Sequence, residues 1–316
     1  MAPSNSCFSS VFLVLLALHF SRIHQVMSLI ITPPNCKPIE ATDVDRVQFA
    51  LNLEFCQAEY FLYGAFGKGL DSISPNLTAG GPPPIGVQKA LLLNPEVARI
   101  SEEIAYQQVG NIRSIFETVG GFPRPLLNLS VTLWALLFDL ALKKPLIPPF
   151  NPYRNSLSFL LAAYAMPDLA QTSYVSSISS FTTNSSSSLA SKLLAIKAGQ
   201  SAVIRTLLYQ NATQFVPPYQ ITVAEFTKAI SELTNILGKC GIKSEGILLD
   251  NTTLGAENRT TSNVLSADAN SLSYSRTEPE ILRIVYGTGN EHLPSGFFPK
   301  VANGNIAKRY LDLLAS

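Results

Sequence analysis

Charged side chains are scarce in this 316-residue sequence, because Asp, Glu, Lys and Arg together make up only 14% of it. Soluble domains usually contain about 25% of these residues. The shortage excludes a disordered, charge-rich stress protein. The net charge of +1 gives no electrostatic reason to expect binding to nucleic acid or to acidic membranes. Apolar residues make up 47% of the chain, which indicates a large buried core.

Histidine is almost absent as well. His19 and His24 lie in the first segment of the chain, and only His292 lies beyond it. A histidine-rich metal site or a His-based catalytic triad therefore has almost no ligands or bases to draw on. His292 follows Glu291 in a predicted loop, where we expect a surface position. The sequence has no Gly-x-Ser-x-Gly motif, so it has no hydrolase signature.

The N-terminal segment is typical of a secretory signal peptide. Residues 8–20 form an apolar run without charge, followed by Arg22. The run is shorter than the ~20 residues that a membrane-spanning helix needs. We predict a signal peptide over residues 1–27 and a secreted protein, extracellular or in the cell wall, with no membrane span after cleavage. An uncleaved N-terminal anchor is the alternative.

Asn-x-Ser/Thr triplets are consistent with secretion, because they are acceptors for N-linked glycans that would also solubilise a chain with so few charges. The predicted glycosylation sites are Asn76, Asn128, Asn184, Asn211, Asn251 and Asn258.

Three cysteines follow the predicted signal peptide, and an odd number leaves at least one of them unpaired. Cys56 lies inside an apolar helical pattern, which is typical of a small core residue. Cys36 and Cys240 lie in irregular segments. We predict a disulfide between them that ties the N-terminal arm to the end of the helical domain. Three free, buried thiols are the alternative.

Helical periodicity and capping signals dominate the middle of the chain, and strand-like alternation is rare. Helices are predicted over residues 42–67, 94–120, 130–142, 153–166, 168–180, 187–211, 222–238 and 277–286. The pair 153–166 and 168–180 is separated at Pro167. We predict an all-α fold: an N-terminal arm (28–41), a helical bundle (42–240), and a long irregular C-terminal appendage packed on the bundle (241–316).

Three predicted helices place polar side chains on their apolar faces when residues are set at about 100° steps. Glu59 falls on a more polar stripe than Glu54, so we expect no special role for it. Because a buried charge needs a partner, we predict that Glu54 and Lys197 form an ion pair across the bundle. Three further side chains would complete its hydrogen bonds: Gln108, Asn111 and Ser201. The alternative is that Lys197 extends to the end of the bundle.

The spacing of Gln108 and Asn111 matches that of the Glu-x-x-His motif in bundles that bind two metals. Both residues are amides, which are weak, neutral ligands for iron or manganese, and Lys197 would repel a cation. The pattern therefore indicates a degenerate metal site with no metal and no other cofactor.

Several long blocks of the sequence, in order, resemble the plant desiccation-related proteins of the ferritin-like group. They are NLEFCQAEYFLYGAFGKG, YQQVGNIRSIFETVGGFPRPLL, AGQSAVIRTLLY, TVAEFTKAISEL, GIKSEGILL and NSLSYSRTEPEILRIVYGTGNEHLPSGFFPK. The resemblance covers roughly residues 40–312. It implies a ferritin-like bundle with extra helices, and a secreted or cell-wall protein linked to drying or seed maturation.

The chain departs from this family at the residues that would bind metal. Relatives read Glu-Val-Gly-His where this chain has Gln108-Val-Gly-Asn111. They read Glu-Ser-Gly-Gln-Asp where it has Lys197-Ala-Gly-Gln-Ser201. The leading hypothesis is therefore a non-catalytic protein without a di-metal centre, with a binding or structural role.

Two alternative functions stay open. One is a di-metal carboxylate oxidase or peroxide-handling enzyme with iron or manganese, to which Glu54, Glu59 and Tyr106 would contribute. The other is a binder of a cell-wall polymer, a lipid or a small ligand through aromatic residues of the appendage, which would otherwise pack the tail onto the bundle. These aromatic residues are Tyr274, Tyr286, Phe297 and Phe298.

Overall fold

The structure is a computed structural model that describes residues 33–249 and 255–312. The predicted signal peptide (1–27) and the acceptor Asn251 lie outside these residues. The described helices belong to the compact unit that begins at Cys36. In the described part of the chain the regular structure is helical, with only isolated β-bridges and no strand. No helix there is long and apolar enough to cross a membrane.

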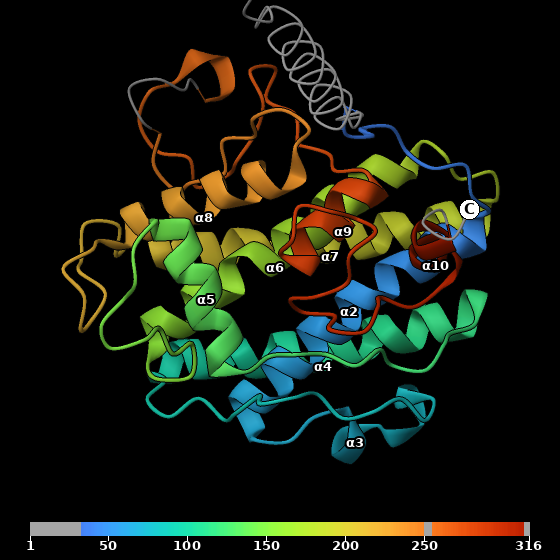
Figure 1. Cartoon of the computed structure of the whole chain (residues 1–316), viewed down its shortest axis with the longest axis horizontal. Coiled ribbons are helices and arrows are strands. Elements are labelled where there is room, and N and C mark those ends of the chain that lie inside the picture. Colours follow the sequence, from blue (N-terminus) through green and yellow to red (C-terminus); the bar gives the residue numbers. More distant parts are fainter. Residues whose placement is uncertain (1–32, 250–254, 313–316) are drawn as a thin grey trace, which may run out of the picture. The chain divides into compact units, whose positions relative to one another are not determined.

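Four long helices form the central bundle (Figure 1). They are α2 (Asp43–Phe66), α4 (Pro95–Val119), α6 (Ser156–Ile178) and α7 (Asn184–Tyr209). Helix α2 packs along α4, α6 packs along α7, and α2 also contacts α6. The four-helix core confirms the predicted all-α, ferritin-like architecture, and it brings together the inward faces of all four helices.

Side-chain caps fix the helix ends close to the predicted positions. Thr42 and Asp45 form a capping box at the start of α2, and Gly67 ends that helix with φ 72°. Asn94 accepts from the Val97 backbone N–H at the start of α4. These caps satisfy backbone groups that a helix leaves without partners at its ends.

The predicted break at Pro167 is wrong, because α6 continues through this residue. Proline removes one backbone hydrogen bond and usually kinks or ends a helix. Most residues of α6 are buried, and they lie on every face of the helix. Tertiary packing therefore holds the helix together at the proline. Gln57 of α2 donates to the Met166 carbonyl, next to the proline, at 3.1 Å.

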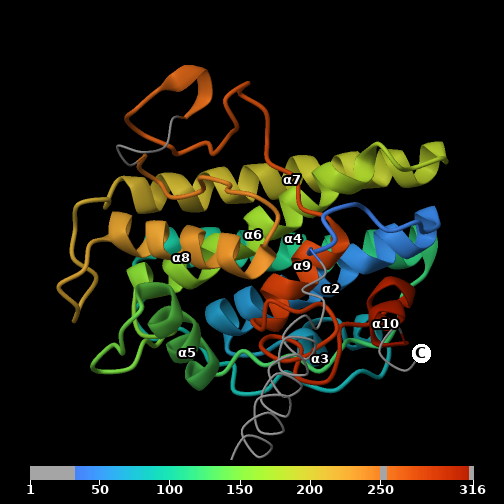
Figure 2. The same cartoon turned by 45° about the horizontal axis from the view of Figure 1, so that its top comes forward.

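Shorter helices surround the bundle (Figure 2). They are α3 (Leu70–Ile73), α5 (Val131–Leu142), α8 (Val223–Gly238), α9 (Glu278–Tyr286) and α10 (Asn305–Asp312), with 3-10 turns at Pro75–Thr78 and Ala256–Asn258. Helix α5 packs on α8, α8 on α9, and α10 on α2. The sequence pattern did not indicate α10, which is only eight residues long but buries Ile306, Ala307 and Tyr310.

A disulfide ties the N-terminal arm to the end of the bundle segment, and an ion pair and aromatic packing anchor the appendage to the bundle. Cys36 is bonded to Cys240, with their Cα atoms 5.6 Å apart. Arg46 of α2 lies 2.8 Å from Glu278 of α9. Two of the four appendage aromatics, Tyr286 and Phe298, are fully buried, and Phe297 packs edge-on against Trp134. These aromatics therefore act as packing anchors.

Candidate functional site

A buried ion pair lies at the centre of the bundle. The Nζ atom of Lys197 on α7 is 2.6 Å from Oε2 of Glu54 on α2, and both side chains are 0% exposed. Lys197 thus points into the bundle instead of extending to its end. The two residues reach each other because helical spacing puts both on inward faces.

The Lys197 ammonium has three acceptors within hydrogen-bond distance. Besides Glu54, they are Oε1 of Gln57 at 2.9 Å and Oε1 of Gln108 at 2.5 Å. An ammonium group carries three donors, so all of them are used. Gln57 was missed from the sequence, although its position three residues after Glu54 places it on the same face of α2.

The Glu54 carboxylate also has neutral partners. Tyr174 of α6 donates to Oε1 at 3.0 Å, and Asn111 of α4 donates to Oε2 at 3.4 Å. Burial lowers the pKa of Lys197, and the Glu54 carboxylate opposes that shift. Burial, together with Glu54, raises the pKa of Tyr174 well above its ordinary value. Tyr174 therefore stays a neutral hydrogen-bond donor.

A chain of amides extends the cluster towards the surface. Gln108 donates to Oε1 of Gln200 at 2.9 Å, and Gln200 donates to the half-buried Gln107 at 2.8 Å. Gln200 was also missed, although it follows Lys197 by three residues. We call the whole cluster the lysine cage: Glu54, Gln57, Gln108, Asn111, Tyr174, Lys197 and Gln200.

Ser201 does not belong to the lysine cage, contrary to the sequence-based expectation. Its hydroxyl donates to Asp168 of α6, whose other oxygen lies 2.9 Å from Arg205. One residue along α7 from Gln200, the Ser201 side chain has turned towards another set of charges. Burial raises the pKa of Asp168, while Arg205 and Ser201 oppose this shift.

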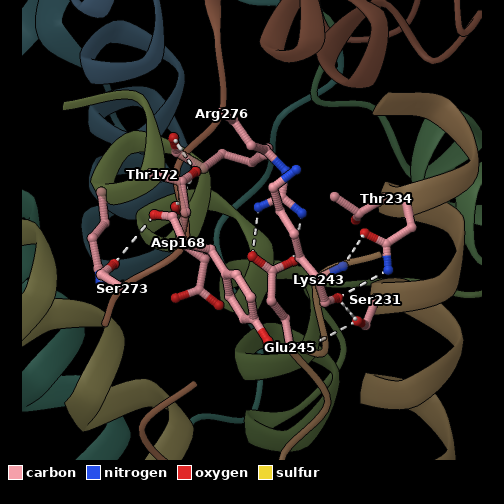
Figure 3. Close-up of polar contacts among 12 residues, drawn as sticks. Asp168, Thr172, Ser231, Thr234, Lys243, Glu245, Ser273 and Arg276 are labelled. Carbon is pink, nitrogen blue, oxygen red and sulfur yellow. Dashed lines mark hydrogen bonds and ion pairs between the residues drawn. The ribbon is translucent and has the colours of Figure 1, made fainter. Parts of the chain in front are cut away.

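Asp168 belongs to a second buried network where the appendage meets the bundle, part of which is drawn in Figure 3. Arg276 forms two bonds to the Glu245 carboxylate, at 2.5 and 2.7 Å. Lys243 lies 2.6 Å from Glu280. We call this the junction network, made of three acids and three bases: Asp168, Glu245, Glu280, Arg205, Lys243 and Arg276.

Glu59 was expected on a polar stripe, and this expectation is wrong. Its side chain is 0% exposed and paired with Arg124, which also lies 2.9 Å from Asp71. The segment after α2 covers this face so closely that a side chain at Gly69 would collide with Glu59. Burial raises the pKa of Glu59 to about 7, although Arg124 acts to lower it.

Two other residues that the sequence analysis considered, Tyr106 and His292, do not belong to the lysine cage. Tyr106 is 56% exposed and packs on Phe66, away from the lysine cage, so it joins neither Glu54 nor Glu59. His292 lies in a turn and is half-buried, with its Nδ1 2.5 Å from the Tyr310 carbonyl oxygen and its ring against Tyr310.

Glu291, the residue before His292, is buried and its carboxylate forms two bonds with Arg283.

Cys56 is a free, buried thiol, as its apolar helical surroundings predicted, and burial raises its pKa to about 12.

Three of the described glycan acceptors are exposed: Asn76, Asn184 and Asn258. Asn128 and Asn211 are half-buried. The Asn211 side chain donates to the Leu207 carbonyl at 2.8 Å, so that bond would have to break for a glycan to be attached there.

Comparison with known proteins agrees with this architecture. Residues 42–210 match the family model described as "Ferritin-like domain". The chain is 46% identical to "Desiccation-related protein PCC13-62" of Craterostigma plantagineum over 266 residues, covering 84% of each protein. It is 50% identical to "Ferritin-like catalase Nec2" of Nesocodon mauritianus over 286 residues, covering 88% of this chain and 91% of the relative. The chain belongs to the plant desiccation-related family of ferritin-like proteins. No solved structure matches it.

In this ferritin-like protein the lysine cage does not fit a pair of metal ions. Such centres take carboxylates and histidines from facing helices. The cage offers one carboxylate, from Glu54, and its remaining oxygen ligands are amides and a phenol. Lys197 fills the place of a cation by bonding to three of those oxygens. No group of three or more His, Cys, Asp or Glu residues suited to a metal occurs in the described parts of the chain.

Proposed function

We propose that this ferritin-like protein is secreted, is non-catalytic and lacks a di-metal centre, and that it acts by binding or as a structural protein in drying stress or seed maturation. The observation that carries the proposal is the Lys197 ammonium with its three oxygen partners in the bundle core. An ammonium group at this position opposes the binding of a metal cation by the same oxygens. The physiological context comes from the printed name of the desiccation-related relative.

Metal content tests this proposal. The secreted protein would be purified without chelator and analysed for iron and manganese. A matched variant, Gln108→Glu/Asn111→His/Lys197→Glu, would restore carboxylate and imidazole ligands on α4 and α7. We expect metal far below one ion per chain in the natural protein and a clear gain in the variant. Near-stoichiometric iron or manganese in the natural protein would overturn the proposal.

The extracellular location is part of the same proposal. The Cys36–Cys240 disulfide is consistent with an oxidising compartment, where such bonds persist, and three acceptor asparagines are exposed. We expect glycosidase treatment of the protein from its native tissue to lower its mass. We also expect its first residue to lie near residue 28. An unglycosylated protein that retains its N-terminal segment would contradict secretion.

Peroxide handling is the second candidate function. The observation that favours it is the relative named a ferritin-like catalase, which is 50% identical over most of both chains. Oxygen release from hydrogen peroxide would be measured with and without added iron or manganese. The leading proposal predicts a rate equal to that of the heat-denatured protein under both conditions. A metal-dependent rate that is lost in Glu54→Gln would make peroxide handling the leading function instead.

A further inference from the structure

An apolar cavity of about 70 Å³ lies between α5, α6 and α8, away from the lysine cage. Its walls come from these three helices, from α9 and from the segment after it. The lining residues are Trp134, Leu137, Phe138, Ala141, Leu161, Ala162, Ala165, Met166, Leu169, Ile230, Leu233, Thr234, Leu237, Ile284 and Phe297. The space exists because small residues lie where α5 and α6 face it: Ala141, Ala162 and Ala165.

Two lining residues carry a polar nitrogen or oxygen on the side chain: Trp134 on α5, with its indole N–H, and Thr234 on α8, which forms a polar wall. Thr234 is the only lining residue with a hydroxyl, and it is buried. Its Oγ1 donates to the Ile230 carbonyl at 2.8 Å. A hydroxyl whose proton is already donated in one hydrogen bond can still accept others through its oxygen lone pairs. The polar wall therefore offers an acceptor to any molecule that enters.

A second, polar chamber of about 10 Å³ adjoins this wall. It shares Ala165, Leu169, Ile230 and Thr234 with the apolar cavity. Its other lining residues include Ser231, Glu245 and Arg276, which are labelled in Figure 3. A space of this size holds about one water molecule. Its charged groups are paired with one another in the junction network, so the chamber suits a neutral polar group.

The apolar cavity meets solvent on the side of α5 and α8. Leu137, Leu233 and Leu237 line it and are only half-buried. Apolar side chains beside them on the same two helices are largely exposed: Leu136 at 55%, Leu140 at 47% and Ile236 at 58%. A ligand can thus enter from an apolar surface and keep part of its chain there.

We propose that this cavity is a binding site for a small amphiphile with a short alkyl chain and one hydroxyl group. The alkyl chain lies among the alanines and leucines, and the hydroxyl donates to Thr234 Oγ1 at the edge of the polar chamber. The volume is about half of the 150 Å³ cavity that admits benzene, which favours a short chain over a ring. The cavity lining shares no residue with the lysine cage, and one hydrogen bond, from Gln57 of the cage to the carbonyl of the lining residue Met166, joins the two sites.

A titration with two probes tests the site. Methyl chemical shifts of the lining leucines and isoleucines would be followed while n-butanol, or xenon as a purely apolar probe, is added to the full secreted chain. We expect saturable shifts with both probes. Thr234→Val keeps the side-chain shape and removes the acceptor, so it should weaken n-butanol binding about five-fold and leave xenon binding unchanged.

Ala165→Leu should fill the space and abolish both sets of shifts. Ala195→Leu, at an exposed position of α7, is the matched control and should bind as the natural protein does. Shifts in the natural protein that grow linearly without saturation would overturn the site, whatever the variants do. Unchanged n-butanol affinity in Thr234→Val would overturn the role of the hydroxyl.

Discussion

The lysine cage and the junction network solve the same physical problem in opposite ways. Both bury charge, which is costly unless every charge is paired and hydrogen-bonded. The cage holds a single ion pair, Glu54 with Lys197, and surrounds it with neutral amides and a tyrosine. The junction network holds three acids and three bases, and several of them have more than one charged or carbonyl partner. Removing one charged side chain from the cage therefore leaves its single partner unpaired. In the junction network, the remaining charges still have other partners.

Removing the cage lysine should have the largest effect. Lys197→Met strands the Glu54 carboxylate in the core, and we expect the free energy of unfolding to fall by about 3–5 kcal/mol. The double variant Glu54→Gln/Lys197→Met should recover most of that loss, because no charge is left unpaired. Lys192→Met, at an exposed position on the same helix, should change stability by less than about 0.5 kcal/mol. Chemical denaturation measures all three, and a harmless Lys197→Met would show that Glu54 is not held by this pair.

Removing the disulfide should affect the junction side of the molecule and spare the cage. Cys36→Ala/Cys240→Ala removes a bond between residues 204 positions apart, and we expect a loss of about 2–4 kcal/mol. Amide hydrogen exchange should speed up in residues 241–249 and 276–286. Equal acceleration around Glu54 and Lys197 would contradict the independence of the two regions.

A pH series distinguishes Glu59 from both regions. Its folded pKa of about 7 lies above the ordinary 4.5, so the folded protein binds the extra proton between these values. The stability from Glu59 is therefore fully present below pH 4.5 and is lost as pH rises through about 7. Relative to Glu59→Gln, the natural protein should lose up to about 3 kcal/mol across this window. Parallel stability–pH curves for the two proteins would refute the shift.

Replacing Ser201 should give the smallest loss of stability, and it tests whether this residue belongs to the junction network or to the lysine cage. Ser201→Ala removes one hydrogen bond to Asp168, and we expect a loss of about 1 kcal/mol. Because the junction network contains Asp168, the shift should appear in the signals of Arg205 and not in those of Lys197. If the Lys197 signals shifted and the Arg205 signals did not, Ser201 would belong to the lysine cage and the assignment to the junction network would be wrong.

The lysine cage was partly predictable because it is built from helices. Periodicity at 100° per residue placed Glu54, Gln108, Asn111 and Lys197 on inward faces. Gln57 and Gln200 share these inward faces, three residues after Glu54 and Lys197, but neither is charged and neither matches the metal-ligand spacing that pointed to Gln108 and Asn111. The helix boundaries followed from caps and glycines, which act within a few residues of the chain.

The junction network could not be predicted from the same pattern. Glu245 and Arg276 lie outside the long helices, in segments without periodicity, and their pairing is set by how the appendage folds back. The prediction for Glu59 was wrong for the same reason, because helical periodicity alone places this residue on the polar side of α2. The segment around Arg124 and Asp71 then covers it. In both cases long-range contacts override the local pattern.

The most direct test of the account is a crystal structure of the natural protein after soaking in manganese, with anomalous scattering measured to locate the metal. The account predicts no manganese between α2, α4 and α7, and Lys197 Nζ within hydrogen-bond distance of Glu54, Gln57 and Gln108. A manganese peak bonded to the Glu54 carboxylate, with Lys197 turned away from the cage, would contradict it.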